Sequence, residues 1–167
     1  MRTILCVASL VALAACSSEP AGLLPLHTVL DGLPAGLDVR FRVTPETVSQ
    51  HQSFDVRLEI TNTTDDTVRV VTANGCLAIP NVLRGNVRIP VQGSLWGCYA
   101  AVTTHTFAPG QTRTIRWQMS ATLYDEQLGV ADGAPLPKGR YIVQAEFDIY
   151  VPGSNRKPVV ELQLTVE

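Results

Sequence analysis

The chain has 167 residues, of which 46% are hydrophobic, and its 13 basic and 15 acidic residues give a net charge of −2 at pH 7. A chain this apolar is not expected to be disordered, and its length suits one domain with a sizeable core. Because the charges nearly balance, the composition gives no reason to expect binding to nucleic acid or to an anionic membrane surface.

The first fifteen residues have the features of a secretory signal peptide. Arg2 supplies a positive charge, residues 4–12 form an almost unbroken apolar run, and small residues follow. The run is shorter than the about 20 apolar residues that a membrane-spanning helix needs. We therefore expect a signal peptide over residues 1–15 and an exported protein.

The cysteine that follows this segment sharpens the interpretation. Leu13-Ala14-Ala15-Cys16 resembles the lipobox of bacterial lipoproteins. The resemblance implies diacylglycerol transfer to the Cys16 thiol, cleavage before Cys16 and acylation of its new amino group. Each buried CH₂ contributes about 0.8 kcal/mol, so several acyl chains anchor a protein durably. Ser17 implies the periplasmic side of the outer membrane in a cell with two membranes. The alternatives are an ordinary signal peptide and a cytosolic chain with an apolar start.

Two cysteines remain for the body of the protein, Cys76 and Cys98, because Cys6 would leave with the signal and Cys16 would carry the lipid. An even number of cysteines in an exported chain predicts a disulfide. Closing a loop of about 23 residues stabilises a fold by about 3.4 kcal/mol on the chain-entropy account. Two free thiols or a metal-binding pair are the alternatives.

Residues 16–36, rich in Ala, Gly, Pro and Ser at the start, predict a tether, and the domain is expected over residues 37–167. From Leu37 onward apolar and polar residues alternate, which is typical of half-buried strands. The expected strands are residues 37–44, 54–61, 67–72, 87–91, 99–107, 111–119, 140–149 and 160–166.

Two stretches lack this alternation. Residues 73–97 predict an irregular excursion with only the edge strand at 87–91, since Pro90 cannot donate to a ladder. Residues 120–138 predict a long connection, with at most one helical turn at 124–128. Seven or eight strands without a convincing helix predict an all-β, antiparallel, immunoglobulin-like β-sandwich, and a barrel is the alternative.

Three motifs resemble known domains. Residues 54–63 are similar to the strand and polar turn of bacterial immunoglobulin-like domains. Residues 107–111, Trp117 and residues 137–141 are similar to the later half of the intracellular proteinase inhibitor (BsuPI-like) family of bacilli. This resemblance covers roughly residues 37–166 and implies the fold more than an activity. The stretch from Cys76 to Cys98 departs from the family pattern.

Candidate chemistry is sparse. Cys98, His105 and Met119 are the ligand types of a blue-copper centre. Gaps of six and thirteen residues spread them over two strands, so a disulfide cysteine, a surface histidine and a core methionine are the preferred interpretation. No Gly-x-Ser-x-Gly motif is present, and no serine stands out near a histidine. We therefore expect no catalytic residue, metal or cofactor.

Recognition usually depends on loops held by a rigid scaffold. The candidate partner-binding residues are Leu95 and Trp96, in the loop that the expected disulfide closes, and Tyr99, directly after that loop. Trp117 alternates with core residues and is expected to be buried. The sequence thus predicts a lipid-anchored envelope protein whose sandwich binds a protein partner, either as an interaction module or as a protease inhibitor. The alternative is a structural accessory subunit of an envelope assembly without a ligand of its own.

Overall fold

The computed structural model describes residues 30, 32–94, 97–125, 130–149 and 157–167, and these residues form strands, turns and loops without a helix. The predicted signal peptide, Cys16 and most of the predicted tether lie outside the described residues. The strands are β1 (Leu37–Thr44), β2 (Thr47–Val48), β3 (Ser53–Asn62), β4 (Val68–Thr72), β5 (Ala78–Arg84), β6 (Val87–Arg88), β7 (Thr103–Phe107), β8 (Thr112–Ser120), β9 (Thr122–Asp125), β10 (Val130–Pro135), β11 (Gly139–Phe147) and β12 (Val159–Val166).

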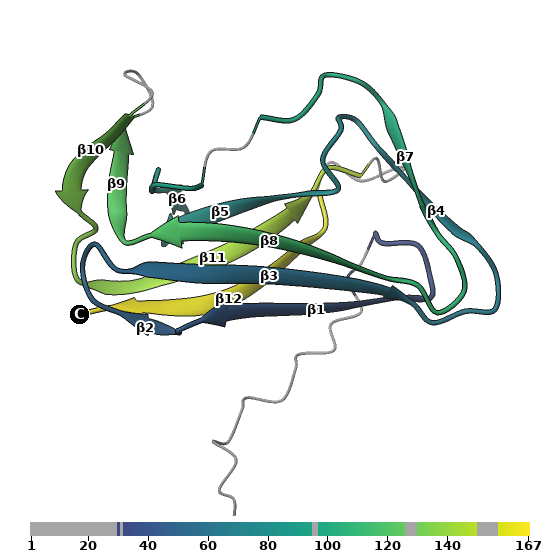
Figure 1. Cartoon of the computed structure of the whole chain (residues 1–167), viewed down its shortest axis with the longest axis horizontal. Helices are drawn as coiled ribbons and strands as arrows, with labels where there is room; N and C mark the ends of the chain where they lie inside the picture. Colours follow the sequence, from purple (N-terminus) through teal and green to yellow (C-terminus); the bar gives the residue numbers. More distant parts are fainter. Residues whose placement is uncertain (1–29, 31, 95–96, 126–129, 150–156) are drawn as a thin grey trace, which may run out of the picture.

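Two sheets pack face to face (Figure 1). One has the order β1-β3-β8, and the other has the order β2-β12-β11-β5-β6. All neighbours are antiparallel except β2, which runs parallel to β12. With β1, β3, β5, β8, β11 and β12 taken as strands A, B, C, E, F and G, the sheets contain A-B-E and G-F-C, the immunoglobulin arrangement. The predicted all-β sandwich is confirmed.

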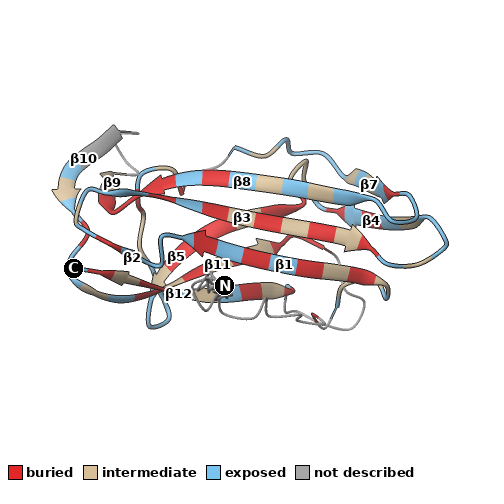
Figure 2. Cartoon of the chain, turned by 60° about the horizontal axis from the view of Figure 1, so that its bottom comes forward, coloured by how far each residue is buried: buried red, intermediate tan, exposed pale blue. Residues whose placement is uncertain are grey.

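The core is built from the alternation that predicted the strands. Figure 2 shows buried and more exposed residues alternating along β1 and β3, since successive side chains of a strand point to opposite faces. The second sheet contributes its own inward-facing residues from β11 and β12. Fully or nearly fully buried members of this core include Val39, Val56, Leu58, Trp117, Tyr141, Val143, Phe147 and Leu164.

Two of the motifs behind the family resemblance have a visible structural role. Tyr141, 1% exposed at the start of β11, donates its hydroxyl hydrogen to the Pro137 carbonyl at 2.5 Å. This is the tyrosine corner of immunoglobulin-like sandwiches, which fixes the chain as it enters strand F. Asn62 ends β3, and its buried Nδ2 lies 2.7 Å from the Asp66 carbonyl and 3.0 Å from the Phe107 carbonyl. That amide ties the turn after β3 to the end of β7.

The structure adds strands that the sequence did not indicate, giving twelve segments among the described residues where seven or eight were predicted. The expectation that residues 73–97 are irregular is wrong for β5, which pairs with both β11 and β6. The alternation is absent there because Ile79 and Leu83, on the face away from the core, are apolar although only half-buried, and because Pro80 and Asn81 interrupt the apolar pattern. The expected long connection over residues 120–138 is instead a hairpin of β9 and β10, with a register shift between Ala131 and Pro135.

Several boundaries also move. The predicted edge strand at 87–91 is reduced to β6, and Val91 makes an isolated bridge to Leu123. The strand expected from Tyr99 begins only at Thr103. In the region of the expected helical turn, residues 124–125 belong to β9, and residues 126–128 lie outside the described part. Leu30 is buried in the core, so packing extends N-terminal to the predicted domain start at residue 37.

β4 and β7 form a two-stranded ribbon at one end of the sandwich (Figure 1). Its inner face carries the buried Val70, Thr72 and Phe107, and a bridge from Thr72 to Ile149 joins it to the chain just after β11. The same end holds the two cysteines. This is the disulfide end of the molecule, defined by residues 72–78, 98–105 and 146–149.

Candidate functional site

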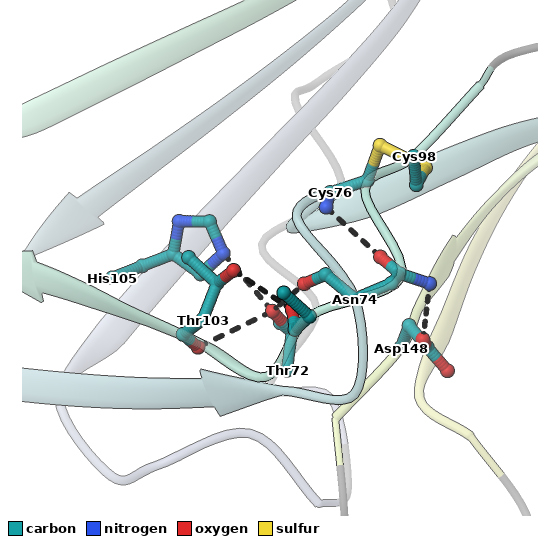
Figure 3. Close-up of a disulfide and its surroundings, with 8 residues drawn as sticks. Thr72, Asn74, Cys76, Cys98, Thr103, His105 and Asp148 are labelled. Carbon is teal, nitrogen blue, oxygen red and sulfur yellow. Dashed lines mark hydrogen bonds between the residues drawn. A yellow bond between two sulfur atoms is a disulfide. The ribbon is translucent and has the colours of Figure 1, made fainter.

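The predicted disulfide is present and defines the candidate site. Cys76 and Cys98 are bonded, with a Cα–Cα distance of 5.4 Å (Figure 3). The bond joins the segment before β5 to the segment before β7. It therefore fixes the start of a central strand of one sheet relative to the β4–β7 ribbon.

A polar network of Asn74, Asp148 and Lys157 lies next to the disulfide. The Asn74 side chain donates to Asp148 and accepts the Cys76 backbone hydrogen at 2.9 Å, as Figure 3 shows. Asp148 is buried and receives the Lys157 ammonium at 2.7 Å, which also reaches Glu146 at 2.9 Å. These two hydrogen bonds raise the pKa of Lys157 above its usual value. The network holds the loop of residues 73–76 against the end of β11.

His105 lies on the inner face of the ribbon, next to Thr72 (Figure 3). The Thr72 hydroxyl lies 2.5 Å from the Asn74 carbonyl and 3.1 Å from His105 Nε2. Since the hydroxyl has one hydrogen and gives it to Asn74, we assign the Nε2 hydrogen of His105 as the donor to Thr72. Burial, and secondarily the Arg113 charge, lower the pKa of His105, so its neutral form dominates at pH 7.

A cavity of about 420 Å³ opens beside these groups. Its apolar walls come from Leu77, Ala78, Ile115 and Trp117, and its polar side carries His105 and Arg113. The Arg113 guanidinium is already positioned, because it donates to the Thr106 carbonyl at 3.0 Å and lies 5.0 Å from the centre of the Phe107 ring. An apolar space with two fixed polar groups suits one apolar side chain or a small apolar ligand.

Tyr99, one of the predicted contact residues, lies at the surface next to the disulfide. Its side chain is 84% exposed, and its carbonyl accepts the Gly75 backbone hydrogen at 2.8 Å. A Cβ at Gly75 would lie 2.9 Å from Cδ2 of the Tyr99 ring, so glycine is what allows the ring to rest there. Val102, three residues further on, is 75% exposed. Together they place two large apolar side chains in water at one end of the domain.

Other sequence expectations have different outcomes. Leu95 and Trp96, like Cys16, lie outside the described residues. Cys98 is bonded to Cys76, and Met119 is 1% exposed in the core, so the copper ligands considered above are not brought together. His105 is half-buried rather than a surface residue. Trp117 is 2% exposed, as expected for a core residue.

No group of three or more His, Cys, Asp or Glu side chains among the described residues is arranged to hold a metal ion. No helix in the same residues has the length and apolarity to span a membrane.

Sequence reasoning missed the Asp148–Lys157 network and the cavity at His105. Asn74 and Asp148 are 74 positions apart, and the cavity joins residues from three separate segments. A sequence pattern within one segment carries no signal for such contacts. The alternation of polar and apolar residues predicts that Asp148 faces outward into water. Only the structure shows that the Asp148 side chain is buried.

Comparisons with known proteins leave the family open. No protein-family model matches the chain, and no curated protein matches it in sequence. Among solved structures, it is similar to a β-glucosidase from Erythrobacter marinus at 13% identity and a TM-score of 0.43, covering 78% of this chain and 15% of that one. It is also similar to a β-glucosidase from Listeria innocua at 13% identity and a TM-score of 0.41, over 78% of this chain and 16% of that one.

The CARDB domain of PF1109 from Pyrococcus furiosus is similar at 11% identity and a TM-score of 0.39, covering 78% of this chain and 94% of that domain. The chain thus spans only a small part of the glucosidases, and these weak likenesses are not evidence of enzyme activity.

Proposed function

We propose that this is a lipid-anchored protein of the bacterial cell envelope whose β-sandwich binds a protein partner at its disulfide end. The anchor rests on the lipobox-like Leu13-Ala14-Ala15-Cys16, which favours the periplasmic side of the outer membrane in a cell with two membranes. The observation that carries the binding is the exposure of Tyr99 and Val102 on a segment held by the Cys76–Cys98 bond.

Three physical reasons support a contact surface at this end. Aromatic side chains are enriched at protein interfaces, where they supply much of the binding energy. The disulfide fixes the backbone of the loop in advance, which reduces the entropy lost on binding. The neighbouring cavity of about 420 Å³ has room for an apolar side chain of the partner.

Binding is favoured over catalysis because the His105–Thr72 pair does not have the arrangement of a base and a nucleophile. Thr72 is 1% exposed, and its hydroxyl hydrogen is given to the Asn74 carbonyl. A nucleophile must reach its substrate and give its proton to the base. Protease inhibition is the specific kind of binding that the family resemblance implies, and a structural subunit without a ligand is the competing role.

The test is site-specific photo-cross-linking of the full-length lipoprotein in its own cell. A photoreactive amino acid replaces Tyr99 in one variant and Val87 in the other. Val87 is 64% exposed on β6 and lies outside the disulfide end, so it is the matched control. We expect one stoichiometric partner from position 99 and none from position 87. Cys16→Ala should abolish the product if the anchor brings the two proteins together.

The outcomes separate the roles. If position 99 gives no defined product, or the same products as position 87, the proposed binding surface is wrong and the structural role is favoured. If the partner is a protease, its activity on a peptide substrate is then measured with the purified lipoprotein. A loss of activity supports inhibition, and unchanged activity assigns the protein to the interaction modules.

A further inference from the structure

Three arginines stand in one row on the solvent-facing side of the β1-β3-β8 sheet. Arg42 of β1 is directly opposite Arg57 of β3, and Arg57 is directly opposite Arg116 of β8. Directly opposite residues of antiparallel strands have Cβ atoms about 4.5–5.5 Å apart. Arg42 and Arg116 are exposed and Arg57 is half-buried, as expected for the face turned away from the core.

The chain offsets little of this positive charge. Arg57 pairs with Glu59, two residues further along the same strand. Within the described part of the protein, Arg42 and Arg116 make no ion pair or side-chain hydrogen bond. The buried Nε of Arg57 also has no hydrogen-bond partner there. Like charges directly opposite each other destabilise a sheet, so the row is expected to cost the folded state some stability.

The residues on either side show that the row is narrow. On one side it is followed by the row of Thr44, Asp55 and Gln118, and on the other by the row of Arg40, Glu59 and Thr114. A uniformly anionic bilayer laid on this face would meet Asp55 and Glu59 as well as the arginines. A short acidic segment that crosses the three strands meets the guanidinium groups and passes between the carboxylates. The charge pattern therefore fits a segment of protein better than a lipid surface.

We propose that the row of Arg42, Arg57 and Arg116 binds a short acidic segment of the protein partner, an inference that rests on the proposed function. Guanidinium groups bind carboxylates through two parallel hydrogen bonds, so the exposed Arg42 and Arg116 can each take one Asp or Glu side chain of the partner, while Arg57, paired with Glu59, adds positive charge between them. The outward face of one sheet thereby becomes a second contact, distinct from the apolar disulfide end.

The test uses the full-length chain in detergent, with dye-labelled hexaglutamate as the probe and hexaglutamine as the neutral control peptide. The double variant Arg42→Gln/Arg116→Gln removes the two unpartnered charges. Arg88→Gln, on the exposed β6 of the other sheet, is the matched control. We expect the double variant to bind hexaglutamate at least about tenfold more weakly, and Arg88→Gln to bind within about twofold of the parent.

Thermal unfolding separates a binding role from a structural one. Since the double substitution removes like-charge repulsion, we expect its Tm at low salt to rise by about 1–3 °C. A Tm that falls together with hexaglutamate binding means that the row is structural, and the inference is then wrong. It is also overturned if the two variants bind hexaglutamate equally, or if only phosphatidylglycerol vesicles bind in a manner that depends on Arg42 and Arg116.

The failure of this inference is distinguishable from failure of the proposed function. If the partner is cross-linked at position 99 in equal yield with and without Arg42 and Arg116, the disulfide end is supported as a contact surface and the arginine row is ruled out. If hexaglutamate binding depends on the row and position 99 gives no product, the arginine row is supported as an anion-binding site and the disulfide end is ruled out as a contact surface.

Discussion

The two ends of the sandwich are closed by different kinds of contact. At the end away from the disulfide, backbone hydrogen bonds join four segments: His51 donates to Ala121 at 2.9 Å, Ser120 to Gln92 at 3.0 Å, and Leu136 to Ala121 at 2.9 Å. The disulfide end also has backbone hydrogen bonds, from Ala73 to Asp148 at 3.1 Å and from Gly75 to Tyr99 at 2.8 Å. It adds to them a covalent bond and the side chains of Asn74, Asp148 and Lys157.

This difference shows where the fold depends on particular residues. Backbone bonds form with almost any side chain, so the first end tolerates substitution as long as the chain path is kept. The disulfide end depends on a few named groups, each with a charge or a redox state that conditions can change. The disulfide end is also the one that exposes Tyr99 and Val102. Four perturbations test the comparison.

The largest effect is expected from removing the disulfide with Cys76→Ser/Cys98→Ser. The loop of about 23 residues regains its freedom in the unfolded chain, so the free energy of unfolding should fall by about 3.4 kcal/mol. Urea unfolding of the oxidised parent and the variant measures the change. A loss below about 1 kcal/mol would show that the side-chain network holds this end without the bond.

The next effect is expected from Asp148→Ala, which leaves the amide of Asn74 and the ammonium of Lys157 without their shared partner. We expect a loss of about 1–3 kcal/mol in the free energy of unfolding, since Asp148 is buried and both hydrogen bonds involve charge. Lys157→Gln should cost under about 1 kcal/mol, because that side chain is half-exposed and water screens its charge. Equal losses for the two variants would contradict this.

At the opposite end, Tyr141→Phe removes only the hydroxyl that contacts Pro137. The ring stays buried, so we expect a loss of about 1 kcal/mol, smaller than that of the disulfide. Chemical denaturation under the same conditions gives the comparison directly. If this one bond proves worth more than the Cys76–Cys98 bond, the contrast between the two ends is reversed.

The smallest effect concerns acid. Burial lowers the pKa of His105, so the unfolded chain takes up this proton at a higher pH than the folded one does. The contribution of His105 is therefore fully present above its unfolded pKa of about 6.5 and is lost as the pH falls through the folded value. We expect His105→Gln to flatten the decline in stability between pH 7 and pH 5. Parallel pH profiles for the parent and the variant would exclude His105 as the cause.

The alternation of the sequence predicted the strands that bury one face in the core and expose the other to solvent. β1, β3, β8, β11 and β12 show this alternation, and the structure places each within two residues of the predicted bounds. β5 was missed because apolar residues on both faces, with Ile79 and Leu83 on the outer one, remove the alternation and because Pro80 is unusual within a sheet. The hairpin of β9 and β10 was missed because its glycines and prolines predict turns.

The candidate site was less accessible to sequence reasoning. Counting cysteines identified Cys76 and Cys98, because two remaining cysteines favour a disulfide in a chain that is expected to be exported. The cavity at His105 depends on distant segments that only the fold brings together. The arginine row is an intermediate case: alternation places each arginine on the outer face, but the row appears only once the strand register is known.

The first two strands also give the domain a mechanical property. β1 is bonded to β3 in one sheet, and β2 continues in the same direction to lie parallel to β12 in the other. The N-terminal side of β1 and the C-terminal end of β12 lie at opposite ends of the sandwich (Figure 1). A pull on the two ends of the domain therefore acts along the strands and loads the β1–β3 and β2–β12 pairings in shear. A domain held at its N-terminus and loaded through a partner would resist such a pull in shear, rather than opening one bond at a time.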